Sequence, residues 1–136
     1  MEAGRCIKIL DPYEWLPGYG ENSVHIHMDG MDLTVFVAYD SEDGTQKQKK
    51  IKFNKVGGFY KGSFPGPKML GVTYNTKDDE NIFIGNLVEF PESEAARIWT
   101  AHFKGIWTVK HYKWTFLSEN TMLEIFAEGV QIEENL

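Results

Sequence analysis

Residues 24–39 read VHIHMDGMDLTVFVAY, two runs of alternating apolar and polar side chains on either side of Asp29-Gly30. Such alternation predicts strands with one buried face, and an Asp-Gly pair between two strands favours a two-residue hairpin turn. A turn at these two residues sets His27 opposite Asp32 and leaves the apolar side chains of both strands on one face. The stretch therefore predicts a β-hairpin, which decides the class of fold.

A second hairpin follows, because Asp43-Gly44 leads into another alternating run at 46–53. A two-residue loop would put the apolar residues of the new strand on the wrong face. A three-residue loop, 42–44, sets Val35 opposite Ile51 and continues one apolar face over three strands. We therefore expect the longer loop.

One amphipathic helix is predicted at about 91–104. Pro91 suits the first helical position, and Gly105 suits the stop. The helical spacing of apolar residues predicts a buried stripe made of Ala95, Ile98, Trp99, His102 and Phe103.

The rest of the chain is predicted to form short strands joined by turns. The strands are expected at 5–10, 58–64, 69–75, 82–90, 109–117 and 122–127, with a polar turn at 76–81. These elements predict an α+β fold that is mainly antiparallel β: a strongly bent sheet or partly open β-barrel of about nine strands, with the helix packed against it. With 136 residues the chain has the length of a single domain, 1–136.

The composition limits the class of protein. The net charge is −6, and no run approaches the roughly 18 to 20 apolar residues that span a membrane. The N-terminus lacks the apolar segment of a secretory signal, and the single cysteine, Cys6, fits a reducing compartment. We therefore expect a cytoplasmic protein that binds neither membrane nor nucleic acid, since most of its acidic surface repels phosphates.

The positive charges are unevenly distributed. Residues 44–77 contain eight lysines and no acidic residue. Four of these lysines fall on one predicted strand and form a candidate anion-facing basic strand: Lys47, Lys49, Lys50 and Lys52. The alternative is that the lysine-rich strand pairs with acidic neighbours or protects an exposed sheet edge, as lysines on edge strands often do.

Two histidines and a carboxylate form a candidate metal site. In the predicted hairpin His25, His27 and Asp32 are neighbours on one face, and imidazole and carboxylate groups are common metal ligands. The alternative is that these residues line the solvated face of an amphipathic strand, where a His27–Asp32 pair would contribute about 0.2 to 1 kcal/mol.

No motif for catalysis is present. The serines lie outside G-x-S-x-G contexts, and no glycine-rich stretch has the phosphate-loop pattern. We therefore assign no catalytic residue and no cofactor. An enzyme is expected less than a binding protein, although a site that is assembled by folding leaves no trace in a sequence.

Aromatic side chains in two loop regions form the candidate binding surface: Tyr13, Trp15, Tyr19, Phe59, Tyr60 and Phe64. Tyrosine and tryptophan are favoured in interfaces because they add a large contact area at low entropic cost. The alternative is that these rings close the open ends of the sheet.

Taken together, these features predict a non-enzymatic cytoplasmic binding domain whose partner is another protein, in the manner of small acidic inhibitors and immunity proteins. A small-ligand-binding β-barrel lined by the aromatic loops is the first alternative. A metal-dependent enzyme with a two-His, one-carboxylate site is the second. A homodimer through an edge strand also fits the strand pattern.

Overall fold

The computed structural model describes residues 1–74 and 83–133, which contain nine strands, one α-helix and one short 3-10 helix. The elements are β1 (Glu2–Gly4), β2 (Ile7–Leu10), η1 (Pro12–Glu14), β3 (Ser23–Asp29), β4 (Asp32–Asp40), β5 (Gln46–Ser63), β6 (Thr73–Tyr74), β7 (Leu87–Glu89), α2 (Glu94–His102), β8 (Lys110–Phe116) and β9 (Thr121–Glu133). No helix in this part of the chain is long and apolar enough to cross a membrane.

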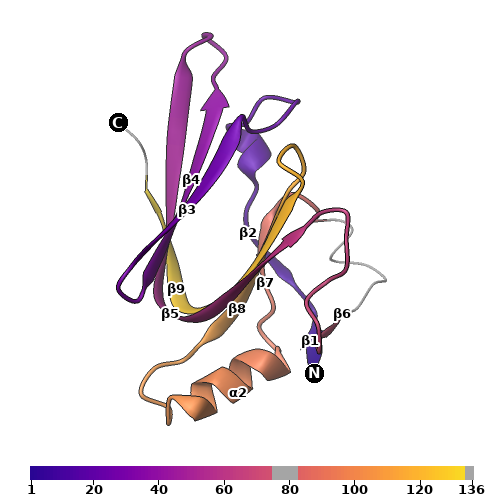
Figure 1. Ribbon diagram of the computed structural model, residues 1–136, viewed down its shortest axis with the longest axis vertical. Helices are drawn as coiled ribbons and strands as arrows, with labels where there is room; N and C mark the ends of the chain where they lie inside the picture. The colour runs from indigo at the N-terminus through magenta and orange to yellow at the C-terminus, as the bar shows by residue number, and fades with distance from the viewer. Residues whose placement is uncertain (75–82, 134–136) are drawn as a thin grey trace.

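Seven of the strands form one antiparallel sheet in the order β2-β7-β8-β9-β5-β4-β3, and β1 and β6 form a small parallel pair. The sheet bends strongly where β5 and β9 curve together, and α2 lies below this bend (Figure 1). Because β2 and β3 are edges rather than neighbours, the sheet does not close into a barrel. The predicted mainly antiparallel fold with one helix is confirmed, in its bent-sheet form.

The turn of the first hairpin lies one residue later than predicted. Asp29 is opposite Asp32, so Gly30 and Met31 form the turn, and His27 is opposite Thr34. Gly30 has φ +62°, which glycine adopts at little cost, and the carboxylate-bearing Asp29 avoids a left-handed conformation. The partner of each residue changes by two positions, and therefore the apolar face is preserved although the predicted register is wrong.

The second hairpin has the predicted register. Val35 lies opposite Ile51, and Ser41 N donates to Thr45 O at 2.9 Å to close the three-residue loop. Gly44 has φ +83° in this loop, a conformation that favours glycine. The requirement for one continuous buried face therefore predicted the correct loop length.

The predicted strands at 46–53 and 58–64 are one strand, β5, with a bulge between Val56 and Gly58. Likewise β9 continues past 127 as far as Glu133. The strands β5 and β9 pair along most of their length. Each strand therefore supplies the hydrogen bonds that keep the other strand in the sheet on both sides of the bulge.

Two predicted strands are shorter than expected. Of the described residues 69–74 only β6 is a strand, and of 83–90 only β7 is one, because Asn86 N donates to Phe83 O in a turn before it. The predicted polar turn at 76–81 lies outside the described residues.

Helix α2 is shorter than predicted, and two residues of its predicted buried stripe are exposed. It begins at Glu94 after the N-cap Ser93, so Pro91 precedes the helix, and it ends at His102. Ala95 and Ala96 are the buried residues of its first turn. Of the predicted stripe, Ala95 is buried and Trp99 and Phe103 pack against the sheet, as predicted, whereas Ile98 is 56% exposed and His102 is exposed.

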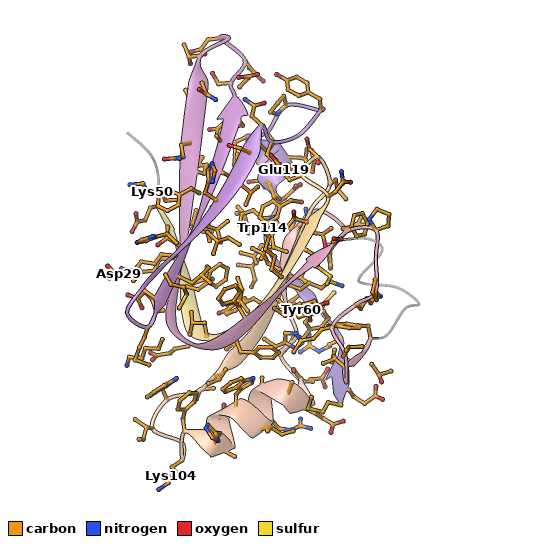
Figure 2. The ribbon with its side chains drawn as sticks, in the orientation of Figure 1. Asp29, Lys50, Tyr60, Lys104, Trp114 and Glu119 are labelled. Carbon is orange, nitrogen blue, oxygen red and sulfur yellow. The ribbon has the colours of Figure 1, made fainter. Side chains whose placement is uncertain are left out.

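The bent sheet has apolar residues on both faces. The side chains inside the curve form the main core: Leu33, Val35, Val37, Ile51, Phe53, Val56, Leu87, Tyr112, Trp114, Phe116, Leu123, Ile125 and Ala127. Figure 2 shows Trp114 inside this curve. On the other face, α2 covers Phe126, and β1 and β6 cover Val88 and Phe90. Polar residues of β8 and β9 are therefore enclosed between the sheet and this second layer.

Candidate functional site

Three enclosed polar side chains lie on the outer face of the sheet, beneath α2. In β8, Tyr112 and Trp114 point into the main core, so by alternation His111 points to the opposite face. Glu124 of β9 lies on that same face. Ser93, His111 and Glu124 are 1%, 0% and 0% exposed.

These three side chains are connected by hydrogen bonds, and we call them the buried relay. The distance from Ser93 Oγ to His111 Nδ1 is 2.8 Å, and that from His111 Nε2 to Glu124 Oε1 is 2.7 Å. The Tyr74 hydroxyl also donates to Glu124 Oε1. The relay thus connects the N-cap of α2 to the centre of the sheet.

Aromatic rings fix the orientation of His111. Its ring lies 4.7 Å from the ring of Phe90 and 4.5 Å from that of Phe126, measured between centroids. The second carboxylate oxygen of Glu124, Oε2, is buried and has no hydrogen-bond partner among the described residues. A buried oxygen without a partner is costly and occurs most often where function requires it.

A groove runs along one side of α2 and reaches Ser93; we call it the α2 groove. Its volume is about 500 Å³. Its walls include Ser93, Arg97 and Thr100 from the helix, and Phe90, Val109 and Lys110 from the ends of β7 and β8. The relay therefore ends at a space that a small molecule could occupy.

The predicted aromatic surface is divided. Trp15 packs against Tyr39, with ring centroids 5.0 Å apart, and borders the main core. Tyr13 and Tyr19 are exposed, and Tyr19 OH donates to Asp40 at 3.1 Å. The pocket that Tyr13 lines together with Leu16 and Trp114 has no volume that would admit a water molecule.

The second aromatic group lies on and after β5. Phe59 is 41% exposed, whereas Tyr60 and Phe64 are half-buried. No ring contact joins this group to Tyr13, Trp15 or Tyr19 in the described part of the chain.

β5 lies between β4 and β9, but β9 pairs with it only from Lys50 onward in the described residues, whereas Lys47 and Lys49 pair with β4 alone. The alternative that the lysines protect a sheet edge is therefore wrong for Lys50 and Lys52. Lys47 and Lys49 are opposite core residues of β4, whereas Lys50 and Lys52 are on the outer face. Figure 2 shows Lys50 on the outer side of the sheet. The structure thus does not bring the four lysines to one surface.

The candidate metal ligands do not converge. His25 and His27 are exposed, and Asp32 forms an ion pair with Lys52 at 3.5 Å and accepts from Lys55 N at 3.2 Å. Within residues 1–74 and 83–133, no group of three or more His, Cys, Asp or Glu side chains could hold a metal ion.

Both edges of the seven-stranded sheet, β2 and β3, are open in the described ranges, and β2 contains Lys8 whereas β3 contains no lysine. β3 pairs with β4, and no strand in the described ranges pairs with its other side. We call this side, Ser23–Asp29, the β3 edge. The strand contains neither lysine nor proline, two residues that discourage further pairing, and His25, His27 and Met28 are exposed.

No family model, curated protein or solved structure matches this chain.

The sequence did not reveal the relay, because its residues come from three separate elements. One signal was present: in MLEIFA, 122–127, Glu124 has apolar neighbours on both sides. An acidic residue inside an apolar strand needs a partner. The partner, His111, is on the adjacent strand.

Proposed function

We propose that this protein is a protein-binding module that accepts an extended segment of its partner as an additional strand along the β3 edge. The open edge of β3 is the observation that carries this proposal. In an antiparallel pair about half of a strand's backbone groups point away from its neighbour, so the seven residues of β3 offer a row of donors and acceptors.

The side chains of β3 add selectivity to this main-chain pairing. Val24 and Ile26 lie opposite Val37 and Val35, so they share the apolar face of the sheet. His25 and His27 lie on the other face. A partner segment that alternates apolar and polar residues would match both faces.

Charge favours a basic partner. The chain has a net charge of −6, and such a field accelerates encounter with a positively charged protein. This combination suits an inhibitor or immunity-type protein of the cytoplasm, acting on the surface of a basic protein. Association should slow as salt is added.

Selection of peptides from a random displayed library against the purified protein tests the proposal. Enriched peptides are expected to alternate apolar and polar residues. The variants His27→Pro and Met28→Pro test the two sides of β3. Neighbouring N–H groups in a strand point to opposite sides, so one variant loses an N–H directed at β4 and the other loses an N–H on the open side. The variant whose melting temperature is retained has lost an outward N–H, and it should bind the peptides roughly tenfold more weakly or worse.

His25→Ala is the matched control, because it leaves the main chain intact and should retain most of the affinity. Equal affinity of the folded proline variant and the original protein would refute binding at the β3 edge.

A further inference from the structure

We propose that Ser93, His111 and Glu124 form a nucleophile–base–carboxylate triad that hydrolyses small carboxylic esters bound in the α2 groove. This inference involves residues distant from the β3 edge and does not depend on the proposed protein binding. It stands on the connected geometry of the buried relay and on the groove at its end.

The hydrogen bonds of the relay permit one arrangement of protons. The Glu124 carboxylate only accepts, so His111 Nε2 carries a hydrogen and donates it at 2.7 Å. In the neutral imidazole Nδ1 is then bare and accepts from the Ser93 hydroxyl at 2.8 Å. The general base thus already contacts the proton that it must remove.

Ser93 Oγ donates to His111 because it is the acceptor in its other hydrogen bond. It accepts from Ala96 N at 3.1 Å, which leaves its hydrogen for His111. Glu94 N and Ala95 N, in the same first turn of α2, make no hydrogen bond within the described residues. These N–H groups lie at the positive end of the helix, next to Ser93 in the sequence.

Glu124 is a positioning residue in this triad. Its buried carboxylate holds the imidazole by one oxygen and stabilises the imidazolium that forms during reaction. Tyr74 donates to the same oxygen, and Lys113 lies opposite Glu124 on β8. The Glu124 side chain is thus held by hydrogen bonds at a position that water does not reach.

The reaction uses water as its only co-reactant. Ser93 Oγ bonds to the ester carbonyl carbon while its proton passes to His111 Nδ1. The carbon–oxygen bond to the alcohol breaks, and the alcohol leaves with that proton. Water then attacks the acyl-serine and gives a proton to His111, which returns it to Ser93 as the carboxylic acid departs.

The dimensions and lining of the α2 groove select the substrate class. A volume of about 500 Å³ suits a small molecule. Phe90 and Val109 offer apolar contact to an acyl chain, whereas Arg97, Lys110 and Glu89 offer polar contact to the leaving group. Short-chain esters combine these two properties.

The test compares the chain with Ser93→Asn. Asparagine is a good N-cap and still accepts from Ala96 N, but it has no hydroxyl nucleophile, so capping and chemistry are separated. We measure labelling by a fluorophosphonate probe, located by mass spectrometry, and the hydrolysis of p-nitrophenyl acetate. We expect an adduct on Ser93 and hydrolysis roughly 100-fold or more faster than in Ser93→Asn.

Labelling of the unmodified protein in buffer and in urea gives a result even if the variant does not fold. An adduct on Ser93 that forms in the folded protein and not in the unfolded one supports the triad. Labelling of Ser93 no faster when folded than when unfolded, with hydrolysis equal to that of Ser93→Asn, overturns it.

Discussion

His111 Nε2 lies 2.7 Å from Glu124 Oε1, and neither side chain is exposed to solvent. Breaking this pair leaves a polar group buried without its partner. We expect Glu124→Leu to lower the free energy of unfolding by about 3 kcal/mol. Urea denaturation measures this loss, and a change below about 0.5 kcal/mol would show that the pair contributes little.

The effect of the Glu124 charge can be measured separately from the effect of its hydrogen bonds. Glu124→Gln keeps an oxygen that accepts from His111 and Tyr74, so the fold should be retained. If the triad hydrolyses esters, kcat should fall roughly 100-fold because the imidazolium loses its counter-charge, while KM changes little. A merely structural role would leave kcat unchanged in the folded variant.

A thiol at position 93 reports the basicity of its surroundings without any substrate. In Ser93→Cys, His111 should promote thiolate formation, and iodoacetamide should alkylate the new thiol faster than the buried Cys6. Adding His111→Gln should slow this alkylation about tenfold. Mass spectrometry of timed samples follows both cysteines, and equal rates with and without His111 would contradict activation.

The contact between α2 and the bend of β5 requires glycine. A Cβ on Gly58 would lie 3.1 Å from Trp99 Cζ2, so Gly58→Ala should push the helix away and cost about 1–3 kcal/mol. Gly129→Ala, also in a strand, is the matched control, because its Cβ would meet nothing within 4 Å. Thermal unfolding compares the two variants, which should differ clearly.

The loop at 42–44 should be sensitive to acid. Hydrogen bonds from Ser41 and Thr45 hold the pKa of the Asp43 carboxyl well below its ordinary value. A lowered pKa in the folded state means that this contribution is complete above pH about 4 and is lost as the pH falls further. An NMR titration measures this pKa, and Ser41→Ala should raise it; an unchanged pKa in that variant would exclude Ser41 as its main cause.

Local patterns predicted the strands well where a buried face alternated with a solvated one. The pairing of Val35 with Ile51 followed from that alternation. The position of the turn at Gly30 could not be predicted from that alternation, because shifting a hairpin turn by one residue leaves the same side chains on the same face. The extent of α2 was overestimated because Ser93 as N-cap stabilises its start more effectively than Pro91.

The buried relay could not be predicted from local sequence patterns, for a different reason. Ser93 precedes a helix, and His111 and Glu124 belong to strands that meet only in the folded sheet. Tyr112, Trp114 and Phe116 alternate along β8 and lie in the main core, and the same alternation sends His111 to the opposite face. Only the second layer of α2, β1 and β6 makes that face an interior.

The central claim, that the protein binds partners through the β3 edge, is tested most directly by amide hydrogen exchange. The measurement compares the free protein with its complex with a library-selected peptide. We predict that exchange slows at Ser23–Asp29, whose outward N–H groups gain acceptors, and not at the opposite edge, Ile7–Leu10. Unchanged exchange across Ser23–Asp29 in a peptide-saturated complex would contradict the claim.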